Sequence, residues 1–189
     1  AATFCGRDGI ADPNSVTMGF AKAAQRLGVT IEREVEVIGI GLDADRITEI
    51  QTSAGPIETR IVVNAAGPWS HQIGQMVGTS IPVQPFRRHI FIADVPPDPK
   101  DLPHEARTSP STRILTIDFD TTFYFHREST GILFGMGDPD EPSSFEQSVN
   151  WDLLERIAPV AARRLPVLAD AGISTAWAGL YEMTPDAMP

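Results

Sequence analysis

The N-terminal part of the chain combines one helical pattern with several strand patterns. Behind Asp12 and Pro13, which suit the N-cap and the first position of a helix, apolar residues recur at helical spacing from Val16 to Leu27. The spacing predicts a helix over residues 13–27. From residue 29 onward, apolar and polar residues alternate around the turn-forming stretches "DAD" and "SAGP". This alternation predicts a strand, a small antiparallel meander and a final buried strand over residues 61–64.

A change of pattern at "IVVNAAGPWS", residues 61–70, marks a junction between a strand and a helix. The β-forming run ends in Ala65, Ala66 and Gly67, and apolar positions resume at helical spacing after Pro68. Two interpretations remain open. The first backbone N–H groups of the helix can face an anionic or planar ligand. Alternatively, the small residues only let the helix pack closely on the strand.

The second part of the chain, from residue 81, is richer in strand patterns. "IPVQPFRRHIFIADVP" predicts a long strand, and "PPDPKDLPHEARTSPS" predicts a surface loop from its content of Pro, Ser and charge. Three short strands are predicted in "TRILTID", "TTFYFHRE" and "GILFGMG", as in an antiparallel sheet. A helix follows over residues 149–170, which Pro159 should bend or end, and "GISTAWAGLYEMTP" returns as a strand.

Charge and composition exclude several classes of partner. The chain has 189 residues, a formal net charge of -10 and a pI near 4.7, so it would repel nucleic acid and anionic membrane surfaces. Its apolar runs are far shorter than the roughly 20 residues that span a bilayer. Cys5 is the only cysteine, which excludes an intrachain disulfide and fits a reducing compartment. We therefore expect a soluble, cytoplasmic protein.

Common catalytic and metal motifs do not explain the chain. The glycine pairs at residues 39–41 and 135–137 lack a third glycine and open no helix, so they do not form a dinucleotide fingerprint. The four histidines form no metal-binding spacing, and no GxSxG sequence is present. The sequence predicts neither a metal site nor a hydrolase.

The order of the segments, however, resembles the D-amino-acid-oxidase superfamily of FAD-dependent oxidoreductases. The segments are "DGIADP", a helix ending "AQRLGVTI", the strand "EVEVIGI", a meander, "IVVNAAGPWS", "PVQPFRRHIFI" and "GLYEMTPDAMP". The resemblance covers essentially the whole chain and is strongest to sarcosine oxidase β-subunits and to dimethylglycine or proline dehydrogenases. It implies an internal fragment that lacks the N-terminal GxGxxG and the C-terminal flavin segment.

The fold class implied by the resemblance is α+β. Residues 1–80 would be an outlying part of an FAD-binding α/β domain with a β-meander. Residues 81–182 would form a substrate-binding domain with a mixed, mainly antiparallel sheet flanked by helices. Residues 183–189 would begin the return to the FAD domain.

The same resemblance implies the cofactor-binding positions. In "EVEV", the backbone of Val37 corresponds to the residue that reads the adenine edge of FAD. Ala65, Ala66, Gly67 and Trp69 correspond to the strand end that closes over the cofactor. FAD is therefore the expected cofactor.

On the substrate side, Tyr124 and Tyr181 resemble sheet residues that face the substrate above the flavin, where they would act as the catalytic residues. Phe125 would complete an aromatic wall, and Arg87 or Arg88 in "PFRRH" would bind a substrate carboxylate. Alternatives remain open here as well. Each tyrosine could be an aromatic residue of the core, and the two arginines could be one solvated residue and one member of an ion pair.

Three departures from the better-known members alter the expected pocket. Gly179 stands where monomeric sarcosine oxidases carry the cysteine that tethers FAD, so a covalent link is excluded there. Tyr181 stands where glycine-oxidase-like relatives have an arginine that clamps the substrate carboxylate. Gly137 stands near the position where some sarcosine oxidases place a histidine.

The resemblance implies oxidation of a secondary or N-methylated amino acid, such as sarcosine, dimethylglycine or proline, by hydride transfer to FAD. The expected partner is a small-molecule amine, and the protein is a possible oligomer. The fragment alone is expected to bind no FAD tightly and to show no turnover. Two alternatives are a non-catalytic structural or partner-binding module, and a flavoenzyme of the glycerol-3-phosphate dehydrogenase type. The latter is disfavoured because a phosphate substrate would call for more basic residues.

Overall fold

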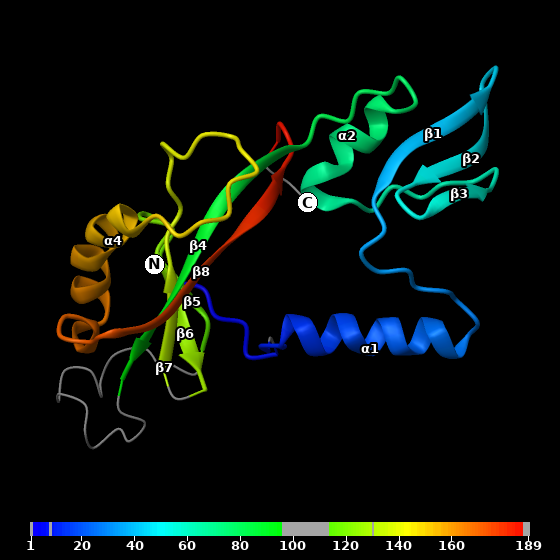
Figure 1. Ribbon diagram of the computed structural model, residues 1–189. Coiled ribbons are helices and arrows are strands. Elements are labelled where there is room, and N and C mark those ends of the chain that lie inside the picture. The colour runs from blue at the N-terminus through cyan, green and yellow to red at the C-terminus, as the bar shows by residue number, and fades with distance from the viewer. Residues whose placement is uncertain (1, 8, 96–113, 130, 187–189) are drawn as a thin grey trace. The chain divides into compact units, whose positions relative to one another are not determined.

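The computed structural model describes residues 2–7, 9–95, 114–129 and 131–186 (Figure 1). The loop predicted over residues 96–111 lies outside these residues. Contacts divide the chain into two units, Ala1–Val62 and Val63–Pro189, and each unit is described here by itself. The domain boundary expected near residue 80 stays a prediction about the complete fold.

The first unit begins with helix α1, Pro13–Arg26, as the apolar spacing predicts. The carboxylate of Asp12 caps the helix by accepting a hydrogen bond from the Ser15 N–H at 2.7 Å. No residue of α1 is buried within the unit, and Phe20 and Leu27 are largely exposed. In the described part of the chain, no helix is both long and apolar enough to cross a membrane.

An antiparallel meander completes the first unit and confirms the alternating pattern. Its strands pair in the order β1-β2-β3, with bounds β1 Val37–Asp43, β2 Arg46–Thr52 and β3 Gly55–Glu58. The prediction of a buried strand over residues 61–64 is wrong for this structure. These residues form no strand, and Ile61 and Val63 are 80% and 84% exposed. A strand needs a neighbour for its N–H and C=O groups, and none of the described strands pairs with this segment.

The second unit is built on a five-stranded sheet in which every described pairing is antiparallel. The strand order is β5-β6-β7-β4-β8. Their bounds are β4 Gln84–Asp94, β5 Thr116–Ile117, β6 Tyr124–Glu128, β7 Gly131–Gly135 and β8 Ile173–Met183. The five strand patterns predicted in the second part of the sequence are therefore confirmed.

Helical elements precede the sheet in the chain and also cover it. Of the strand-to-helix junction predicted at residues 61–70, only the helical half is confirmed, as the short 3-10 helix η1, Gly67–Trp69, followed by α2, Ser70–Gln75. Helix α4, Trp151–Arg164, precedes a second 3-10 helix, η3, Pro166–Leu168. Pro159 does not end α4, which continues to Arg164.

The hydrophobic core lies between α4 and one face of the sheet (Figure 1). Leu153 and Ile157 of the helix pack in one cluster with Phe91, Phe125 and Phe134 of the strands. Because side chains alternate between the faces of a strand, the residues between these core positions point to the opposite face. Directly paired residues of antiparallel strands share a face, which fixes the membership of that second face.

We call the second face the tyrosine face, because it carries both tyrosines of the chain. Tyr124 pairs with Gly135, and Tyr181 pairs with Phe86. The residues of this face include, by the strand register, Phe86, Arg88, Ile90 and Ile92 of β4, Tyr124 and His126 of β6, Leu133 and Gly135 of β7, and Thr175, Trp177, Gly179 and Tyr181 of β8.

Candidate functional site

The side chain of Tyr124 lies across β7 in the space above Gly135. A Cβ atom on Gly135 would lie 2.5 Å from the Tyr124 hydroxyl oxygen and 2.8 Å from the carbonyl oxygen of His89. These distances are too short for any side chain, so the glycine is what permits this position of the tyrosine. The hydroxyl is thereby placed at the centre of the tyrosine face.

Burial keeps the Tyr124 hydroxyl protonated. Burial raises the pKa of Tyr124 to about 12, and the neighbouring Tyr181 adds to the rise while the Arg88 guanidinium opposes it. At neutral pH the residue is a phenol that can donate a hydrogen bond, and it cannot serve as a base. The same electrostatic influences show that Tyr124, Tyr181 and Arg88 form one group.

Arg88 lies over two aromatic rings of the tyrosine face. Its guanidinium carbon is 5.4 Å from the centre of the Tyr181 ring and 6.0 Å from that of Phe86. One guanidinium nitrogen, Nη1, donates a hydrogen bond to the carbonyl oxygen of Arg87 at 2.9 Å. Within the described residues, no carboxylate lies at ion-pair distance from Arg88. The arrangement presents a positive charge beside the aromatic rings of Tyr181 and Phe86.

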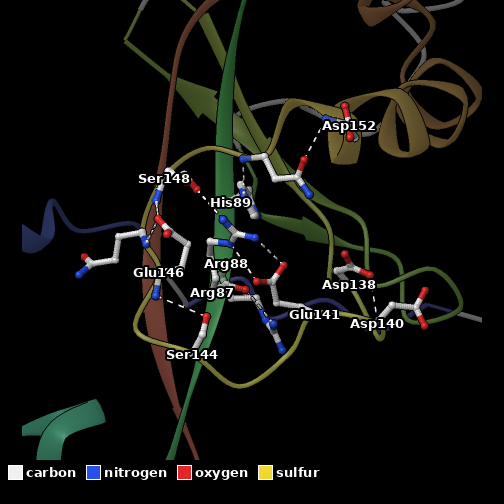
Figure 2. A network of polar contacts seen from close by, with 12 residues as sticks. Arg87, Arg88, His89, Asp138, Asp140, Glu141, Ser144, Glu146, Ser148 and Asp152 are labelled. Carbon is white, nitrogen blue, oxygen red and sulfur yellow. Dashed lines mark hydrogen bonds and ion pairs between the residues drawn. The ribbon is translucent and has the colours of Figure 1, made fainter.

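Arg87 lies on the opposite face, in a buried ion pair. Its Nε donates to Glu141 Oε1 at 2.8 Å, and its Nη1 donates to the carbonyl oxygen of Ser148 at 3.0 Å (Figure 2). The side chains of Arg87 and Glu141 retain only 13% and 3% of their exposure. Arg87 therefore fastens the β7–α4 loop, residues 136–150, to strand β4.

Phe125 is also on the core side of the sheet. It is 2% exposed and packs against the ring of Phe123. Of the residues predicted from the sequence on the substrate side, the structure brings together Tyr124, Tyr181 and Arg88, and it places Arg87 and Phe125 on the other face of the sheet.

A buried histidine that sequence reasoning missed lies next to Arg87. His89 is 2% exposed, and its Nε2 accepts a hydrogen bond from the backbone N–H of Asn150, the N-cap of α4, at 3.0 Å. Burial lowers the pKa of His89, and the nearby charge of Arg87 lowers it further. The ring is therefore a neutral acceptor that joins β4 to the start of the helix. No motif in the sequence marks this role.

The predicted cofactor-facing junction is held by a residue that was not singled out, Asn64. Its Oδ1 accepts from the Ala66 N–H at 3.2 Å, and its Nδ2 donates to the carbonyl oxygen of Ser70 at 2.9 Å. Gly67 adopts a φ of 51°, which favours glycine. An Asn followed by small residues is a common turn signal and could have identified Asn64.

Other predicted cofactor positions are distributed over both units. The ring of Trp69 stacks on Phe145 of the β7–α4 loop, with the centres 5.5 Å apart. Ala65 is exposed, and Ala66 is half-buried. Val37 belongs to the first unit, where it begins β1 and pairs with Thr52. Their contacts with FAD stay predictions.

Comparison with known proteins identifies the family. The sequence model of the family described as FAD dependent oxidoreductase, DAO, matches residues 1–189. The chain belongs to this DAO family. FAD is the cofactor of the family, as the resemblance of the segments implied.

Similar DAO-family proteins include amine dehydrogenases and oxidases. The chain is 28% identical to dimethylglycine dehydrogenase of Rattus norvegicus over 96% of its own length and 22% of that protein. It is 26% identical to sarcosine oxidase subunit beta of Rhizobium meliloti (strain 1021), over 97% of the chain and 41% of that protein. The structure of L-proline dehydrogenase from P. horikoshii matches with a TM-score of 0.79 and 27% identity, covering 95% of the chain and 46% of that protein. The chain thus spans less than half the length of each of these relatives.

Proposed function

We propose that the full-length protein is an FAD-dependent oxidoreductase that oxidises a secondary or N-methylated amino acid by hydride transfer to the flavin. The observation that carries the proposal is the tyrosine face, where Tyr124, Tyr181 and Arg88 come together in a chain of the DAO family. The names of the similar proteins, which refer to dimethylglycine, sarcosine and proline, support this class of substrate.

The residues of the tyrosine face fit a flat cofactor ring and a small substrate. A Cβ atom on Gly179 would meet no other atom within 4 Å, so no side chain fills the space directly above this position of β8. When bound, FAD supplies the two-electron acceptor that oxidation of an amine requires. The backbone of Val37 and the junction residues Ala65, Ala66, Gly67 and Trp69 are the proposed contacts that would hold it.

The tyrosines would position the substrate and exclude water. The neutral Tyr124 hydroxyl can donate a hydrogen bond to a polar atom of the substrate and thereby orient the C–H bond next to the amine nitrogen. The rings of Tyr181 and Phe86 supply an apolar surface. No side chain needs to remove a proton if the amine is bound in its neutral form.

A panel of amines tests the proposal directly. The full-length protein, purified with FAD, is mixed without oxygen with sarcosine, N,N-dimethylglycine, proline, glycine or alanine, and bleaching of the flavin absorbance is followed. We expect rapid bleaching by one of the first three compounds and slow or no bleaching by the primary amino acids. A protein that binds FAD but is bleached by none of the five would refute the proposed substrate class. A protein that binds no FAD would support a non-catalytic module instead.

A further inference from the structure

We propose that Thr122 is a further substrate-binding residue of the tyrosine face, and that its hydroxyl oxygen accepts the N–H group of a secondary amine. The preferred substrate is then a secondary amine, which keeps one hydrogen on nitrogen in its neutral form, rather than a tertiary amine, which has none. The inference rests on the proposed function, because it narrows the substrate class of the same site.

The two glycines of "GMG" make room for two hydroxyl groups on one side of the sheet. Gly135 accommodates the hydroxyl of Tyr124, and a Cβ atom on Gly137 would likewise lie 2.8 Å from Oγ1 of Thr122. Met136, between the two glycines, packs against the hydrophobic core, so the alternation of extended backbone directs Gly137 to the tyrosine face. The Thr122 hydroxyl therefore lies on the same side of the sheet as the Tyr124 hydroxyl.

Thr122 is held in a backbone conformation that threonine rarely adopts. Its φ is 60°, in the left-handed region, where a β-branched residue is strained and glycine would fit freely. The preceding turn fixes this conformation, because the Asp118 N–H donates to the Phe123 carbonyl oxygen at 2.8 Å and Thr121 Oγ1 donates to the Asp118 carboxylate at 2.9 Å. Arg164 of α4 also donates to that carboxylate, at 2.7 Å. Strain fixed in this way is concentrated at ligand sites, and the hydroxyl is what threonine adds here over glycine.

The hydroxyl of Thr122 keeps hydrogen-bonding capacity for a ligand. A hydroxyl oxygen has two lone pairs and one hydrogen. Within the part of the chain that the structure describes, one lone pair accepts the Gly137 N–H at 3.0 Å, and the hydroxyl makes no second hydrogen bond. Thr122 is exposed, so a ligand on the tyrosine face can reach the other lone pair. The Gly137 contact thus fixes the position of the oxygen and leaves it an acceptor.

An acceptor at this position matches the charge that develops when a secondary amine is oxidised. The carbon next to the nitrogen loses a hydrogen with both bonding electrons to the flavin, the nitrogen lone pair closes a C=N double bond, and the nitrogen becomes positive. Its N–H is then a stronger donor, so the Thr122 oxygen stabilises the transition state more than the ground state. A tertiary amine gains nothing from this oxygen, because it presents a carbon atom in place of the N–H.

Two planar acids that differ only in one ring atom test the inference by binding, without turnover. Pyrrole-2-carboxylate has a ring N–H, and furan-2-carboxylate has a ring oxygen in its place. Isothermal titration calorimetry of the full-length protein loaded with FAD measures the Kd of both. Thr122→Val removes the hydroxyl at nearly constant shape, Thr122→Ser keeps it, and Thr122→Gly removes it while relieving the backbone strain. The control is Thr48→Val, at an exposed threonine of β2.

We expect the wild type to bind pyrrole-2-carboxylate more tightly than furan-2-carboxylate. Thr122→Val and Thr122→Gly should each raise the Kd of pyrrole-2-carboxylate by about 5- to 10-fold, as the loss of one neutral hydrogen bond does, and change that of furan-2-carboxylate by less than about 2-fold. Thr122→Ser and Thr48→Val should bind both acids like the wild type. Equal losses for the two acids, no loss for pyrrole-2-carboxylate, or no binding of either acid by the wild type would overturn the inference.

Flavin bleaching without oxygen lets the two proposals fail separately. Sarcosine or proline should bleach the wild type faster than dimethylglycine, and Thr122→Val should lower the limiting rate with the secondary amine by about 10-fold, with a smaller change in the half-saturating concentration. If dimethylglycine bleaches the wild type faster than both secondary amines, the assignment of Thr122 fails and the proposed oxidoreductase remains. If no amine bleaches the flavin but binding of pyrrole-2-carboxylate still depends on Thr122, the N–H acceptor stands and the proposed reaction fails.

Discussion

Tyr124 lies directly opposite Gly135 on the neighbouring strand, and its hydroxyl oxygen occupies the space that a side chain at position 135 would need. The pair joins two strands through one aromatic ring and sets the height of the phenol above the sheet. Because the carbonyl oxygen of His89 lies on the other side of the same space, the ring cannot be displaced toward β4.

Replacing Gly135 with alanine should therefore displace Tyr124. We expect Gly135→Ala to lower the free energy of unfolding by about 1–3 kcal/mol, as overpacking in other cores does. Urea denaturation of the full-length protein measures this change. The matched control is Gly179→Ala on the same face, where an added Cβ meets no atom within 4 Å and stability should stay close to that of the wild type. Equal losses in the two variants would contradict the role of the Tyr124 contact.

Replacing one partner of the buried pair of Arg87 and Glu141 should lower the free energy of unfolding more than replacing both partners. Glu141→Gln leaves the Arg87 charge buried without its partner, and we expect a loss of about 3 kcal/mol in the free energy of unfolding. In the double variant Arg87→Met/Glu141→Met, much of that loss should be recovered, since no buried charge remains. A double-mutant cycle by urea denaturation measures the coupling, and additive losses would show that the pair does not act as a unit.

Stability should fall when the pH drops below the ordinary pKa of histidine. The pKa of His89 in the folded protein is lowered from 6.5 by burial and by Arg87, although Glu141 and Asp138 act in the opposite direction. The unfolded state therefore binds a proton first as the pH falls. The contribution of neutral His89 is complete above about pH 6.5 and is lost as the pH falls toward the lowered value. A protonated ring could no longer accept the Asn150 N–H.

The variant His89→Gln isolates this effect, because its amide oxygen can accept the same N–H but does not titrate. Urea unfolding at a series of pH values from neutral to mildly acidic should show a shallower decline for His89→Gln than for the wild type. Identical slopes would exclude His89 as the titrating group.

Tyr124 should ionise only in strongly alkaline solution. With a pKa of about 12, it stays a phenol across the range in which amine oxidation is normally assayed. The difference in ultraviolet absorbance between the wild type and Tyr124→Phe, recorded as the pH is raised, should show the missing phenolate step near that value. A step near pH 10, the value of an unperturbed tyrosine, would contradict the burial of the hydroxyl.

Local sequence patterns predicted most of the fold because the interactions that form these elements involve residues close together in the sequence. Asp12 followed by Pro13 defines the start of α1 through a cap that involves only neighbouring residues. The meander follows in the same way from alternation and short turns. The strand expected over residues 61–64 was wrong because its β-forming residues say nothing about whether a partner strand is present.

The face of each strand was harder to predict than the strand itself. In "RRHIFIA" both alternating sets are apolar after His89, so the pattern does not show whether Arg87 or Arg88 points to the core. In "FYF", residues 123–125, all three side chains are aromatic, so the pattern does not show whether Tyr124 or Phe125 points to the core. The structure resolves it through α4, which covers the face that carries Phe91. Which face a distant helix covers is a tertiary fact that neither stretch encodes alone.

Strand β4 connects two surfaces that no ligand could touch at the same time. Arg87 is fastened to the β7–α4 loop behind the sheet, and its carbonyl oxygen receives the hydrogen bond of Arg88 in front. A substitution in the loop that shifts Arg87 would thus also shift Arg88, which lies over the ring of Tyr181. The loop is thus linked to the tyrosine face through the backbone of Arg87.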